Sequence, residues 1–236
     1  RIAANADFLS MIVHDIKAPL TGVRLTIETL QDETLPADIN HKLQGIIESS
    51  EGLLLHLHNV LDISRHELGQ LKLQPEEVYV GFLIQRLVNQ YTEMAQNQGV
   101  SLMAQADPSL PPVWADERYV DRVLFNLMAN SLEATPAGGQ IEISARASTL
   151  NGSPAVEIIV ADSGCGIAPE NLDNLFVKYL NRGSHRAGGS GLGLYICKTI
   201  IEAHHGHIWA ESQPGQGTKM HLLLPQKGED DSPEPA

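Results

Sequence analysis

The 236-residue sequence is poor in aromatic residues, in cysteine and in positive charge, and these shortages limit what the protein can be. Lysine and arginine number 16 against 29 acidic residues, so a net charge of −13 leaves no general basic face for DNA or RNA. The two cysteines, Cys165 and Cys197, lack metal-ligand spacing, and we expect unpaired thiols in a reducing compartment. Aromatic content of 5% suits an aliphatic helix bundle joined to a modest α/β layer.

Long apolar runs are also missing from this sequence. No run approaches the roughly 18 residues that cross a membrane, and no signal peptide opens the chain. We therefore expect these residues to make no membrane contact and to be cytoplasmic. The chain begins at Arg1 without an initiator methionine and resembles the C-terminal part of a larger protein, so we expect any membrane anchor upstream.

Two segments near the N-terminus carry apolar residues at alternating spacings of four and three, the pattern of a helix-bundle stripe. The pattern predicts a helix over 4–30, a turn over 31–37, and a second helix from an N-cap at Asp38 towards Leu68. Two helices joined by a short loop form an antiparallel hairpin whose stripes stay partly in water. The hairpin should therefore pair with a second copy as a dimeric four-helix bundle.

The periodicity lapses over 69–77, where we place a linker between a hairpin domain over 1–70 and a second domain over 75–227. In the second domain we expect helices over 80–98, 116–135 and 190–205, and strands over 100–106, 113–115, 141–147, 155–161 and 220–224. This mixture predicts an α+β chain whose second domain is an α/β sandwich with helices on one sheet face. Residues 228–236, rich in proline and acids, should be a disordered tail.

A histidine interrupts the first apolar stripe. His14 follows the stripe residue Val13, so its imidazole should point to solvent, and Asp15 comes next. Taken alone, His14 is more simply a surface histidine. Pro19 in the same helix removes a hydrogen bond and favours a kink, at a cost of about 3 kcal/mol. A bend beside an exposed histidine suggests that stability is given up for function here.

Two polar segments of the second domain suit a nucleotide. Asn126 and Asn130 stand one helical turn apart, and carboxamide oxygens can bind the hydrated Mg²⁺ that accompanies a nucleotide. A structural role is the simpler interpretation of that pair alone. Asp162 ends a buried strand and can accept a hydrogen bond from an exocyclic amine, while Gly164 and Gly166 let the backbone approach a flat base.

Two further polar segments are rich in glycine. The run over 181–194 leads into a helix, and its N–H groups can cradle phosphates with added charge from Arg182 and Arg186. The turn over 215–218 is the other. Neither the dinucleotide-binding fingerprint nor the P-loop pattern is present. A flexible linker and an ordinary hairpin turn are the respective alternatives.

Taken in order, these segments resemble the sensor histidine kinases of two-component signalling over nearly the whole chain. Residues 14–20 are similar to the family's H box, 126–130 to its N box, 162–166 to its G1 box, 176–179 to its F box and 189–193 to its G2 box. The family implies a dimerisation and histidine-phosphotransfer hairpin followed by a Bergerat-type ATP-binding domain. That architecture agrees with the one expected from periodicity.

The resemblance implies transfer of the γ-phosphoryl group of ATP to His14, and then to an aspartate in the receiver domain of a response regulator. Asp15 would hold the proton on the second ring nitrogen. Mg²⁺ would be held by the two N-box asparagines, and Asp162 would bind the adenine amine. The implied ATP-binding residues are Asn126, Asn130, Asp162, Gly164, Gly166, Lys178, Tyr179, Arg182, Arg186, Gly189, Gly191, Leu192, Gly193 and Thr218.

The chain departs from the family pattern beside the N box and in the F box, which is imperfect. Glu133 and Ala134 stand where many members carry a Lys-Tyr pair, so phosphate contacts fall to Lys178, Arg182 and Arg186. The loop over 178–193 would close as a lid.

Two other interpretations compete with an autokinase. One is a non-catalytic, nucleotide-binding dimeric signalling scaffold, against which the intact His14-Asp15 pair and the intact N and G boxes argue. The other is a serine kinase or ATPase of the same superfamily. The histidine-bearing hairpin with its own dimer stripe argues against that second alternative.

Overall fold

The computed structural model describes residues 16, 19–27, 29–30, 35–69, 71–107, 109–178 and 192–226. The chain divides into two compact units, one centred on residues 1–71 and the other on residues 72–187 and 194–236. Each unit is described by itself. Among the described residues, no helix combines the length and the apolar character needed to cross a membrane.

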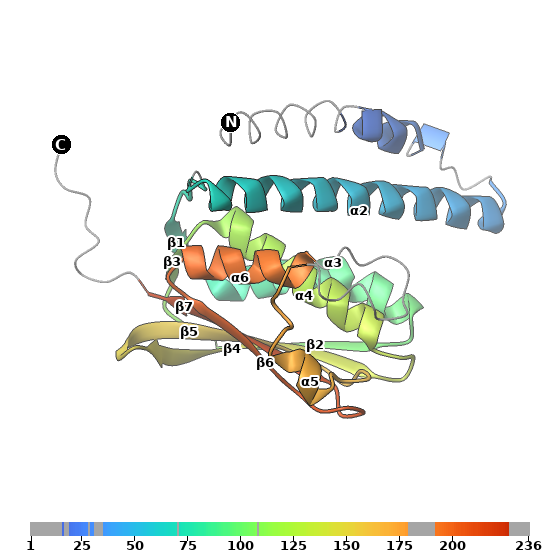
Figure 1. Ribbon diagram of the computed structural model, residues 1–236. Helices are drawn as coiled ribbons and strands as arrows, with labels where there is room; N and C mark the ends of the chain where they lie inside the picture. Colours follow the sequence, from blue (N-terminus) through green and yellow to red (C-terminus); the bar gives the residue numbers. More distant parts are fainter. Residues whose placement is uncertain are drawn as a thin grey trace. The chain divides into compact units, whose positions relative to one another are not determined.

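In the first unit, all the described residues that precede residue 35 are helical, namely 16, 19–27 and 29–30. Helix α2 (Ala37–Glu67) follows (Figure 1). The prediction of Asp38 as its N-cap is wrong: Pro36 holds that position, and its carbonyl oxygen accepts hydrogen bonds from the N–H groups of Ile39 and Asn40. His14 and Asp15 lie outside the described residues.

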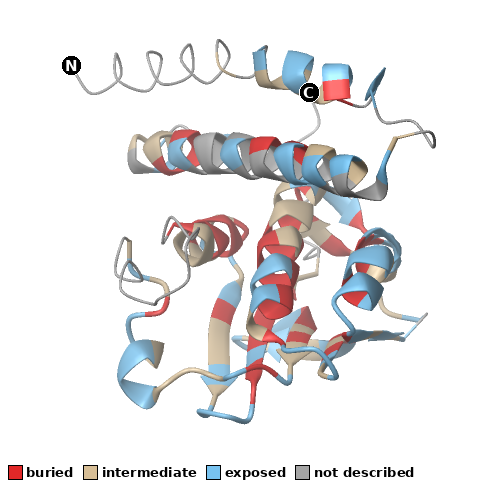
Figure 2. Ribbon diagram, turned by 90° about the vertical axis from the view of Figure 1, so that its right-hand side faces the viewer, coloured by how far each residue is buried: buried red, intermediate tan, exposed pale blue. Residues whose placement is uncertain are grey.

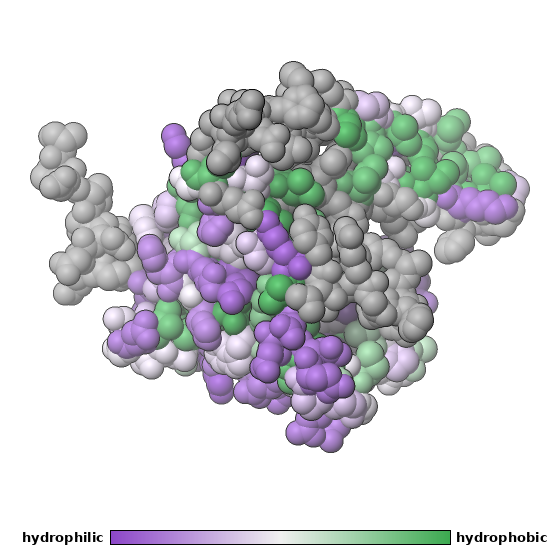
Figure 3. All heavy atoms as spheres, in the orientation of Figure 1, coloured by the Kyte–Doolittle hydropathy of each residue, from purple (hydrophilic) through white to green (hydrophobic). Residues whose placement is uncertain are grey.

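Helix α2 carries a row of exposed apolar side chains. Ile39, Ile46, Leu53 and Val60 recur every seven residues, which is the repeat of a coiled-coil seam, and each is at least 37% exposed. Val23, Leu25 and Leu30 are exposed on the preceding helical segment. Figure 3 shows this apolar surface along the helices of the hairpin. A single chain therefore leaves a bundle stripe in water.

The second unit is built on a five-stranded sheet with the order β2-β4-β5-β7-β6. Its strands are β2 (Ser101–Ala106), β4 (Gln140–Leu150), β5 (Ser153–Asp162), β6 (His207–Ser212) and β7 (Thr218–Pro225). Strands β2 and β4 run parallel, and the other neighbours are antiparallel. A separate pair joins β1 (Glu76–Val78) to β3 (Val113–Ala115).

Three helices cover one face of the five-stranded sheet (Figure 1): α3 (Val80–Asn97), α4 (Glu117–Ala134) and α6 (Gly193–Ala203). The core lies between these helices and the sheet, where buried residues gather in Figure 2. It includes Leu87, Leu127 and Ile200 from the helices and Ile143 and Ile158 from the strands. Burying each such side chain contributes about 1.5–3 kcal/mol. The predicted α/β sandwich is confirmed.

Several predicted boundaries differ from the structure. Strand β1 occupies the end of the expected linker, because Glu76 and Val78 pair with β3. Strand β6 and the short helix α5 (Pro169–Leu172) were not predicted. Helix α6 begins at Gly193 rather than at residue 190, whose placement lies outside the described residues. It ends at Ala203 because His205 has a φ of 58°, and the Gly206 N–H then bonds to Ile201 O. Cys165 and Cys197 are both free thiols, as predicted.

Candidate functional site

Asp162 lies at the end of β5, on the side of the sheet that the helices cover. Alternation along β5 gives it the same orientation as Ile158 and Val160, which are both fully buried. Its Oδ1 accepts hydrogen bonds from the N–H groups of Gly164 (2.8 Å) and Thr218 (3.2 Å). These two bonds fix the carboxylate at the junction of β5 and β7.

The second oxygen of this carboxylate is poorly satisfied. Among the described residues, Oδ2 has one polar neighbour in hydrogen-bond range, the Ser131 hydroxyl at 3.5 Å. Burial raises the pKa of Asp162, and the bonds from Gly164, Thr218 and Ser131 offset this only in part. A half-buried carboxylate with a free acceptor position can receive a hydrogen bond from an exocyclic amine.

Two glycines allow the backbone to close around Asp162. A Cβ on Gly164 would lie 2.6 Å from the Ala134 carbonyl oxygen at the end of α4. Gly217 has a φ of +82°, and a Cβ there would overlap the carbonyl oxygen of Asp162. Side chains at either position would force the loop away from the carboxylate, so the glycines shape the site.

The turn between β6 and β7 braces the loop after β5. The Ser212 hydroxyl donates to Gly217 O (2.7 Å) and accepts from the Ile167 N–H (2.8 Å). The Gly215 N–H bonds to Cys165 O (2.7 Å). The turn over 215–218 therefore joins β6 to β7 and also supports the loop that contains Gly164 and Gly166.

Helix α4 brings the two N-box asparagines to this unit. Asn126 is 7% exposed, and its Nδ2 donates to Arg122 O (2.9 Å), which leaves its Oδ1 as an acceptor. Asn130 is exposed one turn later. An anchored carboxamide with its oxygen available suits a hard cation such as Mg²⁺. Among the described residues, no group of three or more His, Cys, Asp and Glu side chains forms a metal site.

Lys178 and Tyr195 lie together at the two ends of the glycine-rich segment. The Lys178 ammonium is 5.1 Å from the centroid of the Tyr195 ring, a cation–π distance. The structure thus places Lys178 over an aromatic ring on the first turn of α6, and its predicted phosphate contact stays a prediction. Tyr195 was not predicted as a site residue, and neither was Ser131.

The remaining predicted site residues divide into two groups. Leu192 and Gly193 are described, with Leu192 directly before α6 and Gly193 as its first residue. The placement of the others lies outside the described residues: Tyr179, Arg182, Arg186, Gly189 and Gly191.

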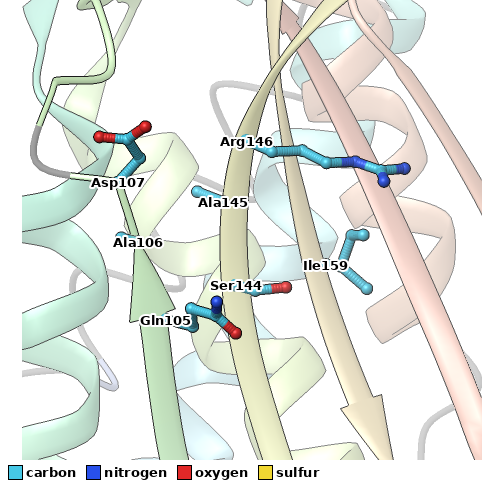
Figure 4. A pocket seen from close by; sticks show the side chains of 7 residues that line it. All are labelled: Gln105, Ala106, Asp107, Ser144, Ala145, Arg146 and Ile159. Atoms are coloured by element: carbon cyan, nitrogen blue, oxygen red, sulfur yellow. The ribbon is translucent and has the colours of Figure 1, made fainter.

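An open hollow of about 410 Å³ lies elsewhere on the second unit (Figure 4). Its polar lining includes Ser144 and Arg146 on β4, beside Ile159 on β5. These residues alternate with the core-facing positions and so lie on the face opposite the helices. Arg146 is bound to Glu157 at 2.7 Å, and no predicted site residue lines the hollow. It is therefore separate from the Asp162 site.

A buried histidine connects the helices of the site unit. His204 follows α6, and its Nε2 accepts the Asp116 N–H (2.9 Å) at the start of α4. Its Nδ1 lies 2.7 Å from the Ile200 carbonyl oxygen, to which it must donate. Both ring nitrogens thus have assigned roles that only the neutral ring can fill. Burial lowers the pKa of His204 from its ordinary 6.5.

We expect acid to destabilise the second unit through His204. As pH falls, His204 binds a proton at a higher pH in the unfolded chain than in the folded protein. The contribution of neutral His204 to the free energy of unfolding is therefore complete above about pH 6.5 and is lost as pH falls towards the lowered pKa of the folded state. His204→Gln can accept the same N–H without titrating. Urea unfolding followed by the fluorescence of Trp114 and Trp209 should show a smaller loss of unfolding free energy for this variant between about pH 7.5 and 5. Equal pH dependence in both proteins would contradict the assignment.

Comparison with protein families finds two matching models. Residues 4–69 match the His Kinase A (phospho-acceptor) domain. Residues 115–228 match the histidine kinase-, DNA gyrase B-, and HSP90-like ATPase family. Together they span the hairpin and the part of the second unit that contains Asn126, Asp162 and Thr218.

Several characterised proteins are similar along most of the chain. The adaptive-response sensory kinase SasA of Microcystis aeruginosa is 30% identical over 227 residues, covering 93% of this chain and 58% of the relative. The alginate biosynthesis sensor protein KinB of Pseudomonas aeruginosa is 30% identical, covering 94% of this chain and 37% of the relative. The chain therefore spans little more than half the length of SasA.

Solved structures show the same folds. Full-length ShkA in complex with AMPPNP superposes with a TM-score of 0.70 at 25% identity, covering 93% of this chain and 45% of that one. The catalytic domain of histidine kinase ThkA superposes with a TM-score of 0.56 at 28% identity, covering 65% of this chain and 96% of that one.

Proposed function

Because the chain belongs to the sensor histidine kinases, we propose that it phosphorylates His14 from ATP and passes the phosphoryl group to an aspartate of a response-regulator receiver domain. The observation that carries the proposal is the fixed carboxylate of Asp162, with one oxygen open to a donor and the N-box helix beside it. The nucleotide analogue in the ShkA structure supports ATP as the ligand. We propose that these domains act in the cytoplasm.

In the proposed reaction, one ring nitrogen of neutral His14 attacks the γ-phosphorus. A nitrogen–phosphorus bond forms as the phosphorus–oxygen bond to ADP breaks, and ADP leaves with that electron pair. Asp15 holds the proton on the other ring nitrogen, which keeps the attacking nitrogen unprotonated. A carboxylate oxygen of the receiver-domain aspartate then attacks the phosphorus. An oxygen–phosphorus bond forms as the nitrogen–phosphorus bond breaks, and His14 is regenerated.

The ATP-binding unit positions the nucleotide in this scheme. Asp162 Oδ2 accepts from the adenine amine. Gly164 and Gly166 let the loop beside it close, because a Cβ would meet the carbonyl oxygens of Ala134 and Gln213, respectively. Asn126 and Asn130 would hold Mg²⁺ through their carboxamide oxygens. When bound, Mg²⁺ neutralises charge on the phosphate oxygens. Lys178, Arg182 and Arg186 supply further positive charge, and the loop over 178–193 excludes water when it closes.

Replacing Asn130 should separate metal-dependent from metal-independent binding. We expect Asn130→Ala to weaken binding of Mg²⁺·ATP by about tenfold or more, or about 1.4 kcal/mol, because one metal ligand is lost. Calorimetric titration with Mg²⁺ and again with a chelator measures both affinities. Asn89→Ala, at an exposed position of α3, is the matched control. An Asn130→Ala protein that binds Mg²⁺·ATP like wild type would make Asn130 structural.

We propose a homodimer that buries the exposed stripe of α2. Replacing Ile46 and Leu53 together by lysine should yield monomers, because a four-helix bundle would have to bury unpaired charge. Light scattering gives the mass, and circular dichroism shows whether the helices persist. His66→Lys, an exposed position on the same helix, should leave the dimer intact. A double variant with the mass of two chains would refute this interface.

A further inference from the structure

Asp116, the residue directly before α4, makes hydrogen bonds to three parts of the second unit. Asp116 is 1% exposed and caps the helix, with Oδ1 accepting the Arg118 N–H (3.2 Å). Its own N–H is bound by His204 at the end of α6. Its Oδ2 accepts the backbone N–H of Gln74 (2.9 Å). Asp116 therefore connects α4, α6 and the segment that leads in from α2.

The bond to Gln74 is separate from the helix cap. A cap needs one acceptor oxygen, and asparagine supplies it as well as aspartate does. Asp116 uses both oxygens: Oδ1 accepts from the N–H and Nε of Arg118, whereas Oδ2 accepts from the N–H of Gln74, 42 positions earlier, and from Nη2 of Arg118. Hydrogen bonds from Arg118 and Gln74 hold the pKa of Asp116 low although burial acts to raise it. The carboxylate is thus kept ionised, with both oxygens as acceptors.

The position of Gln74 along the chain shows which segments this hydrogen bond connects. Helix α2 ends at Glu67, and β1 begins at Glu76, which pairs with Ala115 beside Asp116. Gln74 is thus held just before the chain enters the second unit's sheet pair. Asp116, which accepts this hydrogen bond, also caps α4. Asn126 lies ten residues further along that helix, or about 15 Å at about 1.5 Å per residue.

We propose that Asp116 is a positioning residue for phosphoryl transfer, which anchors the linker from α2 to the helix that carries the N box. The inference rests on the proposed function, because His14 and the ATP site lie in units joined through this linker. Transfer requires the reacting atoms to meet at about 3–3.5 Å, and a misplacement of about 1 Å can cost about 100-fold. An anchored linker restricts the orientations from which the nucleotide approaches His14.

Removing only the donor tests the anchor in the full chain. Gln74→Pro deletes the backbone N–H, whereas Gln74→Ala keeps it and removes the side chain. We expect Gln74→Pro to lower the autophosphorylation rate at saturating ATP about tenfold or more, with the ATP dissociation constant within about threefold of wild type. Gln74→Ala should stay within about twofold in both measurements.

A second pair of variants tests the same hydrogen bond by changing its acceptor, Asp116. Asp116→Asn keeps one acceptor oxygen, which serves the helix cap, so the Gln74 N–H loses its partner and the rate loss should match that of Gln74→Pro. Asp121→Asn makes the same charge change on the same helix, at a residue that pairs with Arg86, and should behave as wild type. Tryptophan fluorescence and ATP affinity show whether each variant is folded.

Failure of this inference is distinct from failure of the proposed function. If wild type is not labelled by ATP, the proposed function fails. If wild type is labelled and Gln74→Pro keeps its maximal rate, or exceeds it, the anchor does not position the reaction. If the rate loss is matched by an equal loss of ATP affinity, Asp116 shapes the nucleotide site instead, and the inference is overturned.

Discussion

Asp162→Asn is expected to lose ATP binding by about 100-fold or more while the second unit stays at least as stable as wild type. The carboxamide oxygen can still accept from Gly164 and Thr218, but the amide nitrogen would then face the adenine amine, donor against donor. Leaving buried donors unpaired accounts for a loss of this size. Calorimetric titration with ATP measures the affinity.

The stability half of this expectation follows from the pKa of Asp162. Because burial raises that pKa, the carboxyl's favourable contribution is present below its ordinary 3.8 and is lost as pH rises through the raised value. At neutral pH the buried ionised carboxylate therefore lowers the free energy of unfolding, and asparagine removes this destabilisation. Urea unfolding measures the difference, with Asp173→Asn, at an exposed position, as control. Retained ATP affinity, or a clear drop in unfolding free energy, would contradict this role.

His14→Gln is expected to abolish labelling from ATP, a loss of about 1,000-fold or more, because the proposed phosphoryl acceptor is then absent. Nucleotide affinity and dimer mass should stay as in wild type, since the spacing of apolar residues in the sequence places His14 off the predicted stripe. His66→Gln, which changes an exposed histidine of α2, is the matched control and should be labelled normally. Undiminished labelling of His14→Gln would refute the assignment.

Periodicity predicted the long elements well because their burial is one-sided. Helix α4 shows this, since Val120, Val123 and Leu127 are fully buried where the 3.6-residue repeat places them. Strand β1 was missed because its two glutamates are exposed, and its pairing with β3 is what makes it a strand. Helix α5 has four residues, too few for a period to show.

The candidate site was predictable where a motif names its residues. Asp162 and Thr218 were named from separate segments, and the β5–β7 register sets them opposite each other. Ser131 and Tyr195 were missed because a lone serine or tyrosine in a helix has no distinguishing pattern. Their contacts with Asp162 and Lys178 arise from how α4, β5 and α6 pack, which no local pattern encodes.

The most direct test of the account is the chemistry of the phosphoryl group that the protein accepts. The full chain is incubated with Mg²⁺ and γ-labelled ATP, and the labelled protein is divided between acid and alkali. Phosphohistidine is lost in acid and survives alkali, and we expect that result, with no label on His14→Gln. Label that survives acid would indicate a serine kinase. A folded, ATP-binding protein that is never labelled would be a scaffold, and either result would contradict the account.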